Sequence, residues 1–174
     1  MLQLYRIPGK SQGSEAMIRK ANPSDLPRLM EIYAIARAYM KASGNPHQWG
    51  DSRPEQLVLE KDIALGQLYV VEDSADIHGA FALILGTDPT YAVIDGAWLD
   101  DSPYVTIHRL AGDGTGGIFA AAVNFAREKS DSVRIDTHAD NATMHHLLEK
   151  HGFVRCGTIW LENGDPRIAY QLLK

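Results

Sequence analysis

The sequence predicts a single mixed α/β (α+β) domain in which one sheet carries helices on both faces. Turn and capping residues divide the chain into elements in the order β-α-α-β-β-β-α-β-α-β-β, and no Pro-, Gly- or Ser-rich linker separates two halves. A chain of 174 residues with 45% hydrophobic side chains suffices for one core. We expect the domain over residues 17–174. A polar extension, residues 1–16, precedes it and leaves room for a short strand at Leu2–Ile7.

Capping residues delimit the first strand and two helices. Met17–Ala21 is typical of a short strand, and the Asn-Pro-Ser-Asp run at Asn22–Asp25 predicts a helix start. Apolar residues then recur at intervals of three and four along one helical face: Leu26, Leu29, Tyr33, Ala36 and Met40. Gly44–Pro46 ends this helix. The capping-box spacing of Ser52–Glu55 predicts a second helix that ends near Leu65.

Apolar runs bounded by turn residues define the remaining elements. Leu68–Glu72 and His78–Leu85 are expected to form an antiparallel hairpin, and so are Phe153–Leu161 and Arg167–Leu172. Asp140 is expected to cap the last helix. The other expected elements are, in order, a short strand at Tyr91–Ile94 within a polar insertion, a strand at Tyr104–Ala111, a helix at Ile118–Lys129, a strand at Val133–His138 and a helix at Asn141–His151.

Composition excludes several classes of protein. The net charge of -5, the pI of about 5.8 and the lack of a basic tract argue against a nucleic-acid partner. No apolar run approaches the roughly 20 residues that span a bilayer, and the N-terminus does not have the pattern of a secretory signal. The single cysteine, Cys156, excludes an intrachain disulfide. We expect a cytoplasmic protein that binds neither nucleic acid nor membrane.

A glycine-rich turn precedes the third predicted helix. Residues 112–117 include four glycines, and such a turn before a helix N-terminus offers backbone N–H groups to an anion. No Lys follows the glycines, so the turn is not a Walker A loop, and it lacks the spacing of a dinucleotide-binding fingerprint. Taken alone, the turn is equally compatible with a tight connection that binds nothing.

The segment after the next strand narrows the interpretation. Asn141, Leu147, Gly152 and Phe153 match at correct spacing the Asn-x-x-Ala-x-x-Leu-Tyr-x-x-x-Gly-Phe run of the GNAT acyltransferase superfamily, with Met144 at the Ala position. The chain resembles that superfamily over about residues 17–174. The resemblance implies a mostly antiparallel sheet with a splayed strand pair. It also implies a co-substrate, acetyl-CoA, whose acyl group passes directly to a primary amine.

The resemblance also implies which residues contact the coenzyme. Backbone N–H groups of 114–119 would hold the pyrophosphate, and the N–H of Leu110 or Ala111 would polarise the thioester carbonyl. The expected coenzyme-binding residues are Leu110, Ala111, Gly112, Gly114, Thr115, Gly116, Gly117, Ile118, Phe119, Asn141 and Leu147. Three positions depart from the family pattern. Gly114 replaces Gln or Arg, Phe119 replaces a small residue and is expected to obstruct the phosphates, and Leu148 replaces the Tyr that protonates the leaving thiolate.

Proton transfer from the amine requires a base near the thioester, which the resemblance places between the strands Tyr104–Ala111 and Val133–His138. His108, His138 and Asp136 lie on these strands and are the catalytic candidates. The alternative for each histidine is a half-buried side chain with a structural partner. His145 and His146 do not have the i, i+4 spacing of a metal pair, so no metal is expected.

Acceptor recognition is expected at the first helix and the loop after it. Tyr33, His47 and Trp49 are the candidates, although Trp49 could equally plug the core under the loop. The acceptor is a small-molecule or peptide amine that the sequence does not identify, and a homodimer is left open. Two other functional classes also stay open: a binding module on the same fold without turnover, for which the departures at Gly114, Phe119 and Leu148 argue, and a scaffold that binds no ligand.

Overall fold

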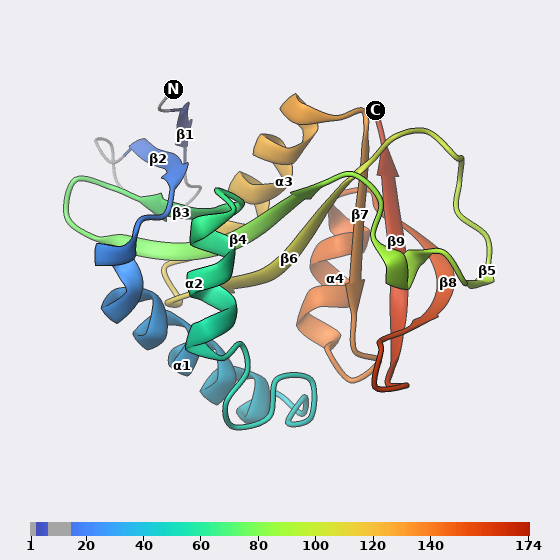
Figure 1. Cartoon of the computed structure of the whole chain (residues 1–174), viewed down its shortest axis with the longest axis horizontal. Helices are drawn as coiled ribbons and strands as arrows, with labels where there is room; N and C mark the ends of the chain where they lie inside the picture. The colour runs from blue at the N-terminus through green and yellow to red at the C-terminus, as the bar shows by residue number, and fades with distance from the viewer. Residues whose placement is uncertain (1–2, 7–14) are drawn as a thin grey trace.

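The computed structural model describes residues 3–6 and 15–174 and contains one nine-stranded sheet (Figure 1). The strand order is β1-β2-β3-β4-β6-β7-β9-β8-β5. β6 (Val105–Gly112) and β7 (Ser132–Thr137) pair in parallel, and every other neighbouring pair is antiparallel. The predicted mixed, mostly antiparallel sheet is therefore confirmed.

The N-terminal strands follow the predicted pattern. β3 (Leu68–Glu72) and β4 (Ile77–Leu85) form the expected antiparallel hairpin. β2 (Glu15–Lys20) begins two residues before the strand expected at Met17, and β1 (Gln3–Arg6) pairs with it. The boundary proposed between an extension and a domain stays a prediction, and residues 1–2 and 7–14 of that extension lie outside the described residues.

The first two helices differ in how well their starts were predicted. Asn22 caps a 3-10 turn at Pro23–Asp25, because its Oδ1 accepts from the Ser24 N–H at 3.0 Å, and α1 (Leu26–Ala42) continues from that turn. α2 (Gln56–Ala64) has Glu55 as its N-cap and no side-chain cap, so the capping box predicted at Ser52–Glu55 is wrong. The physical reason is that a residue preceding proline, here Arg53, is disfavoured in helical conformation.

The C-terminal half contains two further corrections. The strand expected at Tyr91–Ile94 is absent from the described residues, since Tyr91 ends a 3-10 turn (Pro89–Tyr91) that Asp88 caps. The cap of the last helix is Asn141 rather than Asp140, because the Met144 N–H donates to Asn141 Oδ1 at 3.0 Å. The other elements are β5 (Asp95–Gly96), α3 (Ile118–Lys129), α4 (Ala142–Lys150), β8 (Val154–Trp160) and β9 (Pro166–Leu173).

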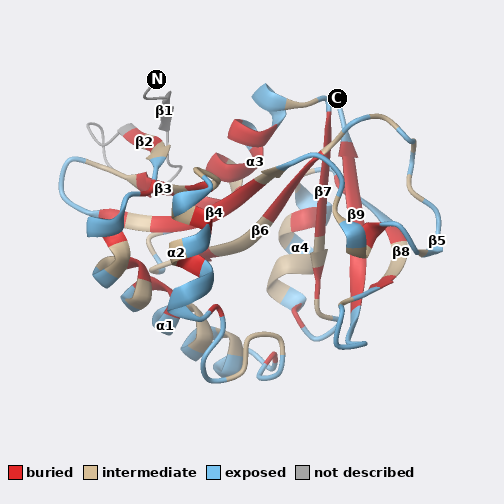
Figure 2. Cartoon of the chain, viewed as in Figure 1, coloured by how far each residue is buried: buried red, intermediate tan, exposed pale blue. Residues whose placement is uncertain are grey.

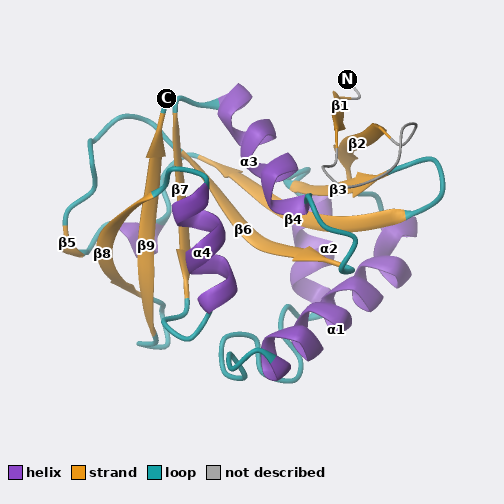
Figure 3. Cartoon of the chain, turned by 180° about the vertical axis from the view of Figure 1, so that it is seen from behind, coloured by secondary structure: helices purple, strands orange, loops and turns teal. Residues whose placement is uncertain are grey.

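Helices cover both faces of the sheet, as predicted. α1 and α2 lie on one face of the N-terminal half, and α3 and α4 lie on the other side of the sheet (Figures 1 and 3). The strands between these layers carry most of the buried side chains (Figure 2). Tyr33 and Leu59 are in the cluster under α1 and α2, whereas Phe125 and Leu148 are in the cluster under α3 and α4. No helix in the described part of the chain is long and apolar enough to cross a bilayer.

The sheet opens between its two halves. β6 and β7 pair only at Val105↔Val133 and Thr106↔Arg134, and they diverge toward their C-terminal ends (Figure 1). β6 also contains a bulge opposite β4, because Ala80 pairs with Ala111 while Ala82 pairs with His108. The divergence exposes the edges of both strands, and the bulge redirects backbone groups at this position. The splayed pair that the resemblance implied is confirmed.

Candidate functional site

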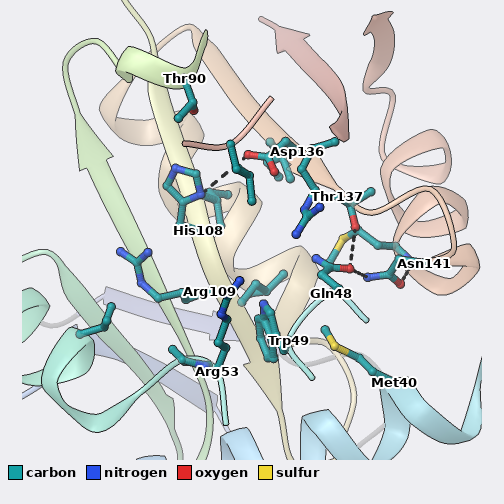
Figure 4. A pocket seen from close by; sticks show the side chains of 18 of the residues that line it. Met40, Gln48, Trp49, Arg53, Thr90, His108, Arg109, Asp136, Thr137 and Asn141 are labelled. Carbon is teal, nitrogen blue, oxygen red and sulfur yellow. Dashed lines mark hydrogen bonds and ion pairs between the residues drawn. The ribbon is translucent and has the colours of Figure 1, made fainter. Parts of the chain in front are cut away.

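A cavity of about 500 Å³ lies where β6 and β7 have parted. Figure 4 shows that its walls come from segments far apart in the sequence. His108 projects from β6, Asp136 from β7, Trp49 and Arg53 from the loop between α1 and α2, and Asn141 from the start of α4. A cavity of this volume suits a small molecule rather than a folded partner.

His108 lies between two carboxylates in this cavity. Its Nε2 is 2.8 Å from Asp88 Oδ2, and its Nδ1 is 3.9 Å from Asp136 Oδ2. Burial of Asp88 opposes its ionisation, but hydrogen bonds from His108 and Thr90 outweigh burial and lower its pKa to about 2. The structure thus brings two predicted residues, His108 and Asp136, together with a carboxylate that the sequence analysis missed. The Asp-Pro-Thr sequence at 88–90 was the available signal, because it marks a capped turn.

Asp136 is itself held in place. The Tyr91 hydroxyl donates to Asp136 Oδ2 at 2.7 Å. Burial, together with the adjacent Asp136 charge, raises the pKa of Tyr91 well above its ordinary value, so this phenol stays a donor. Tyr91 is 2% exposed and packs on Ile159 and Ala169. The carboxylate of Asp136 therefore has a fixed position on the cavity wall.

Side chains from α1 and α2 stabilise the bulge in β6. Arg109, which has a φ of 51°, directs its Nε to Asp62 Oδ2 at 2.7 Å. The Tyr33 hydroxyl donates to the Arg109 carbonyl at 2.7 Å. Tyr33 is 0% exposed and lies under the bulge, so the structure does not place it against an acceptor as expected. No local sequence signal marks Arg109, because its conformation depends on pairing between distant strands.

The α1–α2 loop carries both remaining acceptor candidates, and one of them lines the cavity. Trp49 lines the cavity and packs edge-on against Tyr33 with ring centroids 5.6 Å apart. His47 is exposed and is not part of the cavity wall. Between them, Gln48 accepts a hydrogen bond from Asn141 Nδ2 at 2.9 Å (Figure 4). Trp49 thus remains an acceptor candidate, while Asn141 serves as a cap and as an anchor for this loop.

His138 differs from His108 in its surroundings. It follows β7, and the Asp140 N–H donates to its Nδ1 at 3.1 Å. Its carbonyl accepts from His145 Nε2 at 3.1 Å, and it is not among the residues that line the cavity. These contacts match the alternative to a catalytic role for His138, a half-buried side chain with a structural partner. Within the described ranges, no group of three His, Cys, Asp or Glu side chains is arranged to hold a metal ion.

The glycine-rich turn, residues 112–117, has the backbone geometry of an anion site. Gly114, Gly116 and Gly117 have φ values of 93°, 87° and 76°. Across the described part of the chain, no acceptor is found for the N–H groups of residues 116–120, and the first hydrogen bond of α3 is donated by Ala121. Thr115 donates through both its N–H and its hydroxyl to Asp113 Oδ1, so its side chain is engaged within the loop. Among the described residues, the free donors are therefore those of Gly114, Gly116, Gly117 and the start of α3.

Phe119 does not obstruct this turn. It is 6% exposed and packs in the core against His151 and Phe153, with ring centroids 4.9 and 6.3 Å away. The expected obstruction of the phosphates by this side chain is therefore wrong, because the start of α3 directs Phe119 toward the sheet. Ile118 is likewise buried, so both residues offer a ligand their backbone N–H groups only.

The remaining coenzyme candidates line or adjoin the same region. Leu110 lies on the cavity wall, and Ala111 continues β6 toward Gly112, whose added Cβ would lie 3.1 Å from Ile118 Cγ1. Leu147 packs partly against the main core cluster. Leu148, at the position where the family pattern has Tyr, is 0% exposed. Cys156 is buried, and its Sγ lies 3.4 Å from the Val154 carbonyl, which fits no role as a nucleophile.

Arg167 is a further residue that the sequence analysis did not single out. It lines the cavity from β9 and is 5% exposed. Burial lowers the pKa of its guanidinium, and the charge of Asp136 partly offsets that effect. Arg167 is the one charged residue of β9, and this was the available signal in the sequence.

Solved structures resemble this chain over 91% to 99% of its length. An acetyltransferase of the GNAT family from Streptococcus agalactiae 2603 is 31% identical, with 99% of each chain covered and a TM-score of 0.82. A GNAT family acetyltransferase from Listeria monocytogenes 4b F2365 is 20% identical over 99% of this chain and 100% of its own, with a TM-score of 0.72. The protein yncA from Salmonella typhimurium, solved with its cofactor acetyl-CoA, is 17% identical over 91% and 93% of the two chains, with a TM-score of 0.56. No protein-family model matches the sequence, and no match was found among curated proteins.

Proposed function

The chain belongs to the GNAT family of acetyltransferases, and on that premise we propose that it transfers the acetyl group of acetyl-CoA directly to a primary amine. The observation that carries this proposal is the position of His108 between Asp88 and Asp136 in the cavity where β6 and β7 part. The same strand, β6, runs from this cavity into the glycine-rich turn. One strand therefore connects a site for the acyl group to a site for the phosphates.

The coenzyme end of the site depends on backbone groups. The unpartnered N–H groups at residues 116–120 and the dipole at the start of α3 favour an anion such as a pyrophosphate. Gly114 contributes no side-chain cation. That acetyl-CoA is the cofactor in the yncA structure supports the choice of co-substrate.

His108 is the general base in this proposal. Asp88 accepts the Nε2 proton, which fixes the tautomer and leaves the Nδ1 lone pair on the side of Asp136. The amine nitrogen attacks the thioester carbonyl carbon, a C–N bond forms, and the C–S bond then breaks. The amine proton passes to His108 Nδ1, and the sulfur leaves as the coenzyme A thiolate. Asp136 stabilises the resulting imidazolium and, before that, an approaching ammonium group.

The buried Leu148 does not prevent this reaction. A thiol with a pKa of about 8.5 is a good leaving group, so the thiolate can depart and take its proton from solvent. The absence of an acid at position 148 thus lowers the rate of one step without excluding turnover.

The proposal is tested by coenzyme A release from acetyl-CoA, followed with a thiol reagent over a panel of primary amines. We expect release with at least one amine, and a fall of roughly 10²- to 10⁴-fold in kcat for His108→Gln, since the positioned base is lost. His146→Gln, on the exposed face of α4, is the matched control and should keep wild-type kcat.

A thermal melt separates binding from turnover in the same protein. Acetyl-CoA should raise the melting temperature of both wild type and His108→Gln, because only the folded chain binds it. A rise in melting temperature without release for any amine would favour a binding module. No rise and no release would contradict both functions.

A further inference from the structure

Arg167 is a buried cation that makes no ion pair with a carboxylate of the described residues, although the charges of Asp136 and Asp165 act on it from a longer distance. Its Nη1 donates to the Pro166 carbonyl at 2.9 Å, and no carboxylate of residues 3–6 or 15–174 lies within ion-pair distance of its guanidinium. The side chain is 5% exposed and belongs to the cavity wall. A guanidinium has five N–H donors, so most of the donors of Arg167 have no acceptor among the residues that the structure describes.

Other arginines near the site are compensated from within the protein. Arg109 pairs with Asp62 at 2.7 Å. Arg134, which is also 5% exposed, lies between the rings of Trp98 and Tyr104, each centroid 3.9 Å from its guanidinium carbon. Its Nη2 donates to the Asp100 carbonyl at 3.0 Å, while its Nε has no acceptor among the described residues. Arg167 has no such arrangement. Because an unpaired buried charge is costly, its retention on a cavity wall points to an anion that arrives with a ligand.

Strand register places Arg167 on the same side of the sheet as the catalytic candidates. Ala169 pairs with Asp136 across β9 and β7, so these two side chains lie on the same face of the sheet. Arg167 precedes Ala169 by two residues along β9, and its side chain therefore lies on that face as well. Asp136 is already engaged by the Tyr91 hydroxyl at 2.7 Å. The cavity wall therefore carries Asp136 and His108 at one position and the guanidinium of Arg167 at a neighbouring position.

A second arginine reaches the cavity from the opposite wall. Arg53 lines it from the α1–α2 loop and is exposed. Its backbone N–H donates to the Trp49 carbonyl at 3.1 Å and its carbonyl accepts from Arg37 Nη1 at 3.2 Å, but its guanidinium has no acceptor among the described residues. Two guanidinium groups without carboxylate partners thus border one cavity of about 500 Å³. A purely cationic acceptor would be repelled by both.

We propose that the acceptor is a small amine that also carries a carboxylate, an amino acid in the broad sense, and that Arg167 binds this carboxylate while the amine lies at His108 and Asp136. This inference rests on the proposed acetyl transfer. It makes Arg167 the residue that determines substrate class, with Arg53 assisting at the entrance. A free amino acid fits the cavity by size and by charge at both ends.

Matched acceptor pairs test the proposal. Coenzyme A release is measured with the proteinogenic L-amino acids and with the carboxamide of each, which keeps the amine and removes the anion. We expect at least one amino acid to be acetylated with a kcat/KM roughly 10- to 100-fold above that of its amide. Arg167→Gln should bring this ratio close to one, mainly by raising KM for the acid, and Arg167→Lys should restore part of it. Arg127→Gln, on the exposed surface of α3, is the control and should keep the wild-type ratio.

A binding measurement keeps the inference separate from turnover. The preferred amino acid should raise the melting temperature of the wild type and not that of Arg167→Gln, and far-UV circular dichroism verifies that the variant is folded. Equal use of acid and amide, or a preference for amines without a carboxylate, would overturn the inference and leave acetyl transfer intact. If no amine is turned over, Arg167-dependent stabilisation by an amino acid still supports the carboxylate site. Failure of every amino acid to bind or react overturns it.

Discussion

The ring of His108 has a carboxylate on each side, and the two carboxylates have different tasks. Asp88 is in hydrogen-bond contact at 2.8 Å, whereas Asp136 is 3.9 Å away and is held by Tyr91. Asp88 therefore determines which ring nitrogen carries the proton, and Asp136 is available to a cationic group in the cavity. In the proposed reaction, Asp88 therefore acts both as the cap of a short 3-10 turn and as the group that orients His108 on β6.

Replacement of Asp88 by Asn tests this role through pH. The pKa of Asp88 is lowered to about 2 from 3.8, so its ionised form contributes stability above about pH 4 that is lost as the pH falls through 2. The difference in unfolding free energy between wild type and Asp88→Asn should therefore shrink by about 2 kcal/mol between pH 7 and pH 2. Urea denaturation followed by tryptophan fluorescence measures it. Asp101→Asn, in the same segment and exposed, is the control.

The same variant has an expected effect on activity at neutral pH. An amide at position 88 no longer requires the Nε2 proton of His108, so the productive tautomer is lost in part and kcat should fall by roughly 10²-fold. A constant stability difference across the pH range, together with unchanged kcat, would show that Asp88 only caps its turn.

The proposed binding of the coenzyme phosphates by the glycine-rich turn depends on the backbone conformation of its glycines. Gly116 has a φ of 87°, and a Cβ added there would meet nothing within 4 Å. Gly164, in the turn between β8 and β9, has a φ of 85° and equally open space. The two glycines thus share a conformation and an environment but differ in their distance along the chain from the start of α3.

Alanine substitutions at Gly116 and Gly164 distinguish a loss of stability through backbone strain from a loss of acetyl-CoA binding. Each variant should lose about 1 to 2 kcal/mol of unfolding free energy, because a residue with a Cβ is disfavoured at positive φ. Only Gly116→Ala should also reduce the rise in melting temperature caused by acetyl-CoA, since its backbone shift reorients the free N–H groups of the turn. An equal response of both variants to acetyl-CoA would show that this turn does not hold the coenzyme.

Across the whole molecule, what the sequence predicted well is what local residues determine. The helix Ile118–Lys129 and both hairpins were expected because glycines and polar turns bound their apolar runs. The coenzyme half of the site stays a prediction, which rests mainly on the spacing of Asn141, Leu147, Gly152 and Phe153. By contrast, the roles of Asp88, Arg109 and Arg167 depend on strand register, a bulge and contacts between distant segments. Phe119 was misjudged because the sequence does not show which way the first turn of α3 faces.

The two halves of the molecule are joined at one end by strands and at the other by side chains. β6 and β7 share only two residue pairs, so the open end of the sheet depends on the α1–α2 loop (Figure 1). Gln48 Oε1 accepts there from Asn45 Nδ2 at 2.8 Å and from Asn141 Nδ2 at 2.9 Å. Thr137 Oγ1 adds a longer contact of 3.4 Å. One amide oxygen thus links the N-terminal half to β7 and α4 across the cavity.

Gln48→Met should loosen this link while keeping the length of the side chain. The amide donors of Asn45 and Asn141 lose their acceptor, which should cost about 1 to 3 kcal/mol of unfolding free energy. Because the loop also carries Trp49 and Arg53 into the cavity, KM for the acceptor should rise while kcat changes little.

Gln56→Met is the control for this substitution. At this exposed position Gln56 Nε2 donates to Glu60 Oε1 at 2.7 Å, so the change removes a surface contact and should alter the unfolding free energy by less than about 0.5 kcal/mol. Equal effects of the two substitutions on stability and KM would mean that the Gln48 amide does not contribute to holding the two halves together.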